Sequence, residues 1–114
     1  MCHVSLDYFL AEIQITQGDK YAERLEAVEK EIELMRNLDH PHIVRYLGSR
    51  RDMAHSAFYI LLEYVSCGSI QGLLKTMGGP LDERVIRKYS RQILLGLAYL
   101  HSRNPPVAHR DIKS

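Results

Sequence analysis

The spacing of apolar residues predicts three strands and three helices. Apolar residues stand at alternating positions over residues 9–15, which is the period-two pattern of a strand. Two further segments, 42–47 and 58–65, are typical of strands, and the polar stretch 48–55 between them predicts a hairpin connection. The predicted helices span 21–38, 70–77 and about 82–101, with Asp82 as the N-cap of the last one. The order of strand, helix, two strands and two helices indicates an α+β fold.

The last predicted helix is more apolar than a surface helix. One face carries apolar residues at helical spacing, and Leu94, Leu95 and Ala98 extend the apolar surface around its second half. A helix of this kind is buried in a large domain, and the rest of the chain is too short to cover it. We therefore expect the chain to be a piece of a longer fold. Its uncovered apolar surface predicts poor solubility or dependence on a chaperone.

The helix predicted over 21–38 carries one carboxylate on its apolar side. When residues 25–38 are wound as a helix, Glu31 falls inside the arc of apolar side chains, whereas the other charged residues fall on the opposite arc. A carboxylate that faces a core is costly unless a cation pairs with it. Two interpretations remain open. Either Glu31 meets a cation in the folded protein, or it lies at the edge of the packed face and reaches water.

Composition and charge exclude several classes of protein. The chain has 114 residues, 46% of them hydrophobic, and a formal net charge of +1. This apolar content is too high for a disordered chain, and the small net charge argues against nucleic acid or a membrane surface as a partner. No apolar run approaches the roughly 18 residues of a membrane span. The two cysteines, Cys2 and Cys67, are typical of a reducing compartment, which predicts free thiols and a cytoplasmic protein.

Candidate chemistry lies at the end of the chain. Asp111 and Lys113 stand two positions apart in a loop after the last predicted helix. An aspartate can accept the proton of a hydroxyl group and a lysine can neutralise phosphate charge, so the pair indicates a phosphoryl-transfer site. A metal site is not expected, because His40 and His42 have no third ligand at a suitable spacing.

Three segments together resemble the eukaryotic protein kinase domain, and within it the MAP kinase kinase kinase group. They are residues 31–44 (EIELMRNLDHPHIV), 62–70 (LEYVSCGSI) and 109–113 (HRDIK), in the order and spacing of that family. The resemblance covers residues 9–114 and implies a protein-kinase-like fold with an incomplete small lobe. The implied segments are 1–20 (a divergent N-terminal strand region), 21–65 (a partial small lobe and the hinge) and 66–114 (the first helices of the large lobe, ending in the catalytic loop).

The resemblance also implies catalytic roles. Asp111 matches the catalytic base, Lys113 the lysine that contacts phosphate, and Arg110 the arginine that receives an activation-loop phosphate. Glu31 matches the glutamate of the small-lobe helix, whose partner in the family is a strand lysine that holds the phosphates of ATP. This match agrees with the position of Glu31 on the wound helix.

Nucleotide binding is implied at a second set of residues. Ala11 matches the small residue over the adenine ring, and Leu62 matches the gatekeeper. Glu63 and Val65 match the hinge, whose main-chain carbonyl and amide groups bind adenine, and Ser69 matches a position near the ribose. The implied cofactors are ATP and magnesium, although this chain lacks the metal ligands of the family.

The chain departs from the family pattern where the family stabilises the transferred phosphate. Ile13 replaces the strand lysine, no glycine precedes Gly18, and the sequence ends before the asparagine and the Asp-Phe-Gly aspartate that bind magnesium. Phosphoryl transfer depends on positioning and on charge neutralisation by lysine and metal. We therefore expect a fragment of a serine/threonine protein kinase of a MAP kinase cascade, with a downstream kinase as protein substrate, that is inactive as this chain alone. The alternative is a truncated pseudokinase-like binding module that docks partners without turnover.

Overall fold

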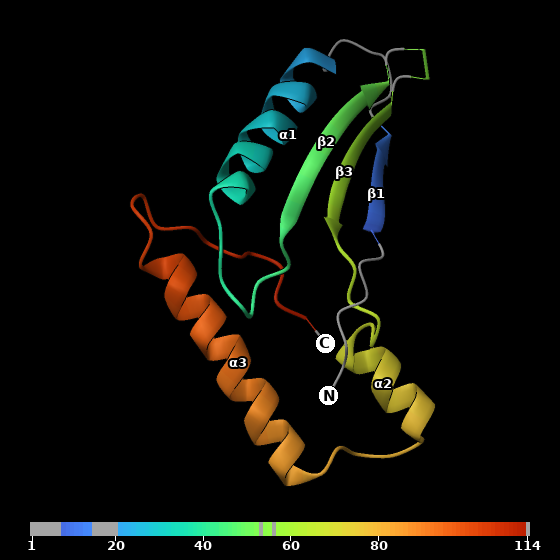
Figure 1. Ribbon diagram of the computed structural model, residues 1–114, viewed down its shortest axis with the longest axis vertical. Coiled ribbons are helices and arrows are strands. Elements are labelled where there is room, and N and C mark those ends of the chain that lie inside the picture. Colours follow the sequence, from blue (N-terminus) through green and yellow to red (C-terminus); the bar gives the residue numbers. More distant parts are fainter. Residues whose placement is uncertain (1–7, 15–20, 53, 56, 114) are drawn as a thin grey trace. The chain divides into compact units, whose positions relative to one another are not determined.

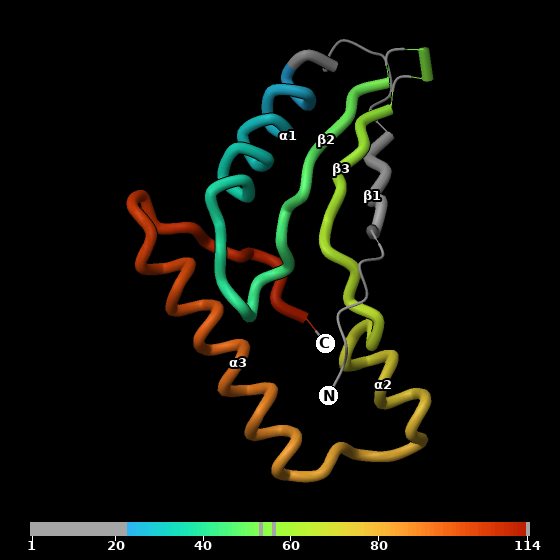
Figure 2. The backbone as a smooth tube through the Cα atoms, viewed as in Figure 1, coloured from blue at the N-terminus to red at the C-terminus, as the bar shows by residue number. Residues whose placement is uncertain are grey.

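The computed structural model describes residues 8–14, 21–52, 54–55 and 57–113, with side chains described from residue 23 onward (Figures 1 and 2). The chain divides into two compact units. The strand unit contains the described residues of 5–39 and 44–64. The helix unit contains residues 40–43 and the described residues from 65 onward. The segment boundaries that the resemblance implies remain a prediction.

The described strands form one antiparallel sheet in the strand unit (Figure 1). They are β1 (Tyr8–Gln14), β2 (Tyr46–Asp52) and β3 (Ala57–Glu63), in the order β1-β3-β2. The apolar strand β3 takes the central place, where both of its edges are paired and its side chains are more buried than those of β2. The predicted α+β fold class is confirmed.

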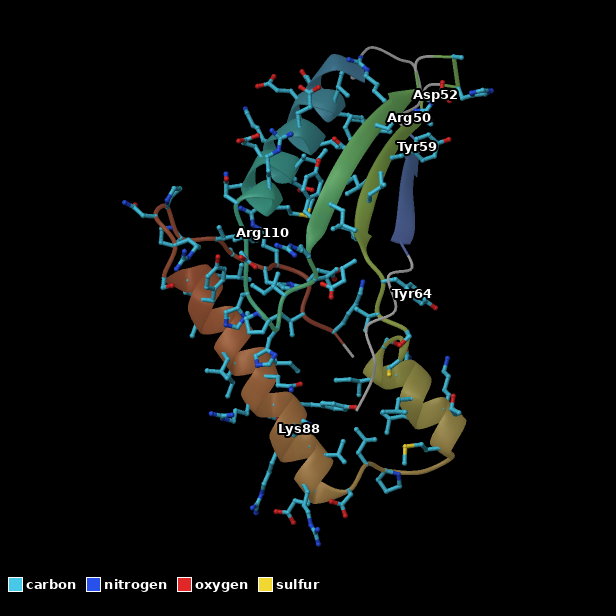
Figure 3. All side chains as sticks on the ribbon, in the orientation of Figure 1. Arg50, Asp52, Tyr59, Tyr64, Lys88 and Arg110 are labelled. Atoms are coloured by element: carbon cyan, nitrogen blue, oxygen red, sulfur yellow. The ribbon has the colours of Figure 1, made fainter. Side chains whose placement is uncertain are left out.

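The strand predicted over 42–47 is wrong in position. β2 begins only at Tyr46 and continues through the polar stretch that the apolar pattern assigns to a hairpin connection. Within that stretch Arg50 pairs with Tyr59 (Figure 3), and Arg51 pairs with Phe58. An edge strand tolerates polar side chains, because main-chain pairing on one side is enough to hold it in the sheet. The apolar pattern therefore does not reveal where β2 lies.

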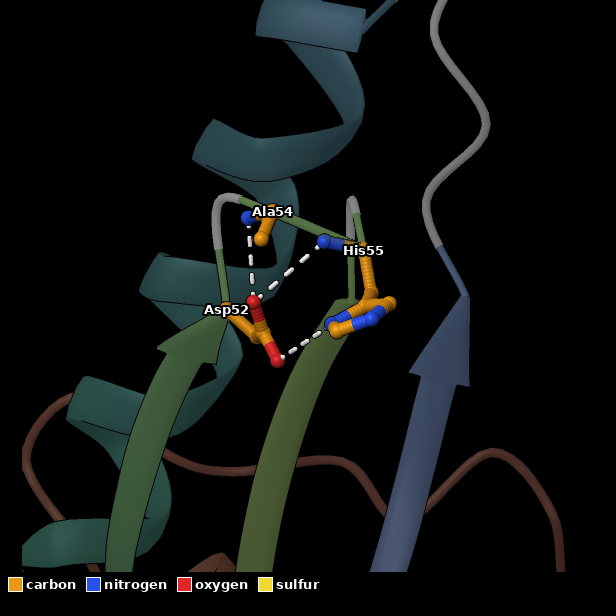
Figure 4. Close-up of polar contacts among 3 residues, drawn as sticks. All are labelled: Asp52, Ala54 and His55. Carbon is orange, nitrogen blue, oxygen red and sulfur yellow. Dashed lines mark hydrogen bonds and ion pairs between the residues drawn. The ribbon is translucent and has the colours of Figure 1, made fainter.

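The turn between β2 and β3 is closed by the Asp52 side chain (Figure 4). Asp52 Oδ1 accepts hydrogen bonds from the N–H groups of Ala54 (3.0 Å) and His55 (3.3 Å), and Asp52 Oδ2 lies 2.9 Å from His55 Nδ1. The contact with the His55 ring, followed by these main-chain donors, holds the pKa of Asp52 below its usual value. An ionised carboxylate therefore holds the hairpin turn at neutral pH.

Helix α1 (Tyr21–Arg36) completes the core of the strand unit. Ile32 is only 4% exposed and lies in one buried cluster with Phe58 and Ile60 of β3. The partly buried residues packed against this cluster are Leu25, Val28, Met35, Tyr46 and Leu62. The helix ends two residues before the predicted position, where Leu38 N–H bonds to Met35 O at 3.1 Å.

The helix unit contains α2 (Ile70–Met77) and α3 (Glu83–His101), close to the predicted positions. The predicted N-cap of α3 is confirmed, because Asp82 Oδ1 accepts a hydrogen bond from Arg84 N–H at 2.8 Å. α2 ends at Gly78, whose φ of 67° is the left-handed conformation that favours glycine at a helix C-terminus. Among the described helices, none is long and apolar enough to cross a membrane.

Residues 40–43 pack on α3 instead of forming a strand. Ile43 N–H bonds to His40 O at 3.1 Å, which closes a turn, and the His40 ring centroid lies 4.9 Å from that of Tyr99. Gly96 of α3 allows a close approach, because a Cβ atom built there would lie 3.2 Å from His42 O. These contacts explain why the apolar run that begins at residue 42 does not form a strand.

The apolar surface of α3 is only partly covered. Gly96 and Leu100 are buried, whereas Leu94 is 64% exposed and Leu95 is 40% exposed. The apolar character all round the second half of this helix is thus a real feature of its surface. Such a surface favours association with other apolar groups.

Candidate functional site

The predicted acid and lysine of the closing loop lie together. Lys113 Nζ is 2.9 Å from Asp111 Oδ2, and both side chains are largely exposed. The hydrogen bond and the charge of Lys113 hold the pKa of the Asp111 carboxyl below its usual value, with a smaller contribution from His109. Asp111 is therefore an anion at neutral pH that can accept a hydrogen bond from a hydroxyl group.

The main chain around Asp111 adopts an unusual conformation that the sequence does not reveal. Arg110, labelled in Figure 3, lies in the loop after α3. Its φ of +66° is in the left-handed region that residues other than glycine rarely adopt. His109 Nδ1 accepts a hydrogen bond from Asp111 N–H at 3.2 Å and so closes the turn around Arg110. Because residues with a strained main chain cluster at functional sites, the conformation of Arg110 is independent support for a functional role of this loop.

The strand unit positions two of the implied nucleotide-binding residues at the end of β3. Leu62 is partly buried against the core cluster of Ile32, Phe58 and Ile60. Glu63, the last residue of β3, donates its N–H to Arg45 O at 2.8 Å. Its carboxylate Oε2 accepts the Arg45 N–H at 3.1 Å. The side chain of Glu63 thus takes part in the main-chain pairing next to β2.

The register of the sheet places two further positions on β1. Ala11 pairs with Ile60, and Ile13 pairs with Phe58. Their side chains lie outside the described residues. The adenine contact that the resemblance implies for Ala11 therefore stays a prediction. The replacement of the family lysine by Ile13 is a fact of the sequence alone.

Glu31 is exposed on α1, and the described residues offer it no hydrogen bond or ion pair. This position corresponds to the second of the two interpretations, in which the carboxylate reaches water at the edge of the packed face. The physical reason lies in the apolar arc itself. The part with Ile32 packs on the sheet, whereas Leu34, on the other side of Glu31, is 47% exposed. The catalytic role implied for Glu31 stays a prediction.

The helix unit carries the remaining implied nucleotide contacts in the loop before α2. Val65 is 48% exposed, and its carbonyl accepts the N–H of Gly68 at 3.0 Å. Ser69 is the N-cap of α2, because its Oγ accepts the N–H of Gly72 at 3.0 Å. This capping bond gives Ser69 a structural role, and its contact with ribose stays a prediction. Cys67 in this loop is not a free thiol, which corrects the expectation from composition.

The described residues do not form a metal site. No group of three or more His, Cys, Asp or Glu side chains within the described ranges is arranged to hold a metal ion. A hollow of about 380 Å³ lies in the strand unit between α1 and β2. It is lined by Glu29, Ile32, Glu33, Arg36, Ser49, Arg51 and Phe58. None of the implied site residues lines this hollow.

The implied site residues are shared between the two units. Glu31, Ala11, Leu62 and Glu63 belong to the strand unit, and Val65, Ser69, Arg110, Asp111 and Lys113 belong to the helix unit. Within the units, the structure brings Asp111 together with Lys113 and packs Leu62 against the core cluster of the strand unit. Sequence reasoning missed Arg45 and the conformation of Arg110, because main-chain bonding and φ angles leave no signal in residue type.

Comparison with known proteins identifies the family of the chain. The family described as "Protein kinase domain" matches residues 8–114. The chain is 48% identical over 95 residues to "Mitogen-activated protein kinase kinase kinase ANP1" of Arabidopsis thaliana, which covers 83% of this chain and 14% of the relative.

Other relatives carry similar names. "Mitogen-activated protein kinase kinase kinase 5" of Arabidopsis thaliana is 44% identical over 105 residues, which is 91% of this chain and 14% of the relative. "Mitogen-activated protein kinase kinase kinase 3" of Homo sapiens is 47% identical over 92 residues, which is 81% of this chain and 14% of the relative. The chain thus spans only a small part of the length of the curated relatives that it matches.

Proposed function

We propose, from the premise that this chain belongs to the protein kinase domain family, that it is a segment of a serine/threonine protein kinase of a MAP kinase cascade. The observation that carries the proposal is the contact of 2.9 Å between Asp111 and Lys113 next to the strained Arg110. The names of the relatives support the cascade, and the Ile112-Lys113 pair after Asp111 favours serine/threonine over tyrosine specificity by resemblance. The protein substrate would be a downstream kinase.

The closing loop supplies the chemistry of this proposal. The anionic Asp111 would bind the hydroxyl group of the protein substrate and accept its proton, and Lys113 would neutralise charge on the transferred phosphate. ATP would supply the phosphate, with its adenine at the main chain of Glu63 and Val65. Arg110 would receive an activation-loop phosphate. The described residues do not fit a magnesium ion, because they hold no cluster of metal ligands, and no step is assigned to the metal.

We propose further that the 114 residues do not transfer phosphate by themselves. Ile13 cannot hold a phosphate, and the described residues give Glu31 no cation. Charge neutralisation by lysine and metal supplies most of the stabilisation in phosphoryl transfer. Incubation of the purified chain with labelled ATP, magnesium and a generic protein substrate should give no more product than Asp111→Ala. Turnover above that variant would contradict the proposal.

A truncated pseudokinase-like binding module is the second candidate. The exposed position of Glu31 favours it, because that carboxylate is not held in a phosphate-binding ion pair by any described residue. Such a module would dock protein partners without turnover. A rise in the thermal midpoint of unfolding with ATP and magnesium would show that the adenine pocket forms despite Ile13. The absence of a rise would favour the binding module or an incomplete kinase fragment.

The proposal includes a cellular setting. We place the protein in the cytoplasm, with protein partners rather than nucleic acid or membrane, and with a chaperone that covers the exposed apolar side chains of α3. The exposure of Leu94 and Leu95 supports the chaperone. Cell fractionation and co-purification with cytoplasmic chaperones test this setting, and recovery with membranes would contradict it.

A further inference from the structure

The Glu63 side chain replaces a main-chain acceptor at the end of the sheet. In a hydrogen-bonded pair of a regular antiparallel ladder, the two opposite residues exchange both N–H···O=C hydrogen bonds. Glu63 and Arg45 make the first of these, from Glu63 N–H to Arg45 O at 2.8 Å. For the second, Arg45 N–H bonds to carboxylate Oε2 of Glu63 at 3.1 Å, in place of the main-chain carbonyl of Glu63.

The local irregularity of β2 accounts for this exchange of acceptors. The pairing of β2 with β3 shifts register between Tyr46 and Gly48, directly after Arg45. A bulge adds a residue and bends the strand, so the main chain before it leaves the regular ladder. The partly buried Glu63 side chain reaches across and satisfies the donor that the bend displaces. A carboxylate is a stronger acceptor than a carbonyl, which favours this arrangement over a return to the ladder.

We propose that Glu63 is a positioning residue for the adenine ring, through its side chain. By binding Arg45 N–H, the carboxylate leaves the main-chain carbonyl of Glu63 available to the exocyclic amine of adenine. This inference rests on the proposed function, in which that carbonyl belongs to the adenine-binding hinge. It adds a specificity role, because the side chain decides whether the carbonyl faces a ligand donor or the N–H of Arg45.

The test compares two nucleosides and four forms of the full 114-residue chain. Adenosine carries the exocyclic amine and purine riboside lacks it, and neither needs a phosphate site. Glu63→Met keeps the length of the side chain without a strong acceptor. Glu63→Gln keeps an acceptor oxygen without the charge. Arg45→Ala keeps the N–H donor and removes the guanidinium, so it is the matched control.

The parent chain should prefer adenosine over purine riboside by about tenfold, which is the usual effect of one hydrogen bond. Glu63→Met should lose that preference, and hydrogen exchange of its Arg45 amide should accelerate by about tenfold. Glu63→Gln and Arg45→Ala should keep both the preference and the slow exchange. If Glu63 had only a structural role, Glu63→Met would weaken the binding of both nucleosides equally and leave the preference for adenosine intact. That result would overturn the proposal.

The remaining outcomes separate this inference from the proposed function. If Glu63→Met fails to fold, Glu63→Asp carries the same expectation, because its carboxylate is one methylene too short to reach Arg45 N–H. If hydrogen exchange of the Arg45 amide is unchanged in Glu63→Met or Glu63→Asp, the hydrogen bond from Arg45 N–H to the Glu63 carboxylate does not form in solution. That result overturns the inference. If the parent binds neither nucleoside, the proposed adenine site is wrong. The hydrogen-exchange data still show whether the bond between Arg45 N–H and Glu63 forms.

Discussion

Lys113 Nζ lies 2.9 Å from Asp111 Oδ2, so the two charged groups of the closing loop neutralise one another in the structure. The pair explains why the pKa of Asp111 is below its usual value. It also means that Lys113 has to leave Asp111, at least in part, before it can contact a phosphate. Since both side chains are largely exposed, the cost of that separation is small.

Lys113→Met should raise the pKa of Asp111 toward its ordinary value, because both the hydrogen bond and the positive charge are removed. Titration of the Asp111 carboxyl carbon by NMR measures this change. Lys113→Arg keeps the cation and should leave the pKa low. An Asp111 pKa that is the same in the parent and in Lys113→Met would show that the contact does not persist in solution.

Asp52→Asn should lower the thermal midpoint of unfolding at neutral pH, because the hairpin turn loses an ionised acceptor beside His55. The pKa of Asp52 is lowered on folding, so its contribution to stability is present above the unfolded pKa and is lost as pH falls through the folded pKa. The difference between parent and variant should therefore shrink in acid. Glu29→Gln, which removes one exposed carboxylate of α1, is the control for the loss of a negative charge.

Gly96→Ala should destabilise the chain, although alanine is the better helix former by about 1 kcal/mol. The added Cβ would lie 3.2 Å from His42 O, a main-chain atom of the turn that packs on α3. Gly72→Ala in α2 is the matched control, because its Cβ would meet only the Ser69 hydroxyl at 3.4 Å. Chemical denaturation should show a loss for Gly96→Ala and a gain for Gly72→Ala. Equal gains would mean that residues 40–43 do not pack on α3.

Ile32→Ala should lower the free energy of unfolding by about 2–4 kcal/mol, because it removes a side chain from the buried cluster with Phe58 and Ile60. Leu34→Ala, on the exposed side of the same helix, should cost less than about 1 kcal/mol. Urea denaturation of the two variants tests which side of α1 faces the core. Similar losses for both would contradict the packing of α1 described above.

Local sequence was enough to predict the helices and strands that are determined by interactions between residues close together in the chain. α2 and α3 are bounded by side-chain caps and a glycine, so their limits follow from Ser69, Gly78 and Asp82. β3 is central and apolar, and its pattern shows it. β2 is an edge strand held by main-chain bonds, so its polar residues gave no strand signal and the prediction placed it too early.

The same distinction between local and tertiary effects applies to the residues of the candidate site. Residue types and spacing predicted Asp111 and Lys113, because their chemistry is a property of the side chains themselves. The position of Glu31 could not be decided from the winding of the helix, since only packing shows which part of the apolar arc meets the sheet.

The sequence by itself determined the order of the elements, the N-cap of the last helix and the family resemblance of the chemical groups. Tertiary structure alone decided the register of the sheet and the bond between Glu63 and Arg45. The physical reason is that capping and periodicity act within a few residues. Main-chain pairing, in contrast, joins residues that are distant in the chain and is nearly independent of their type.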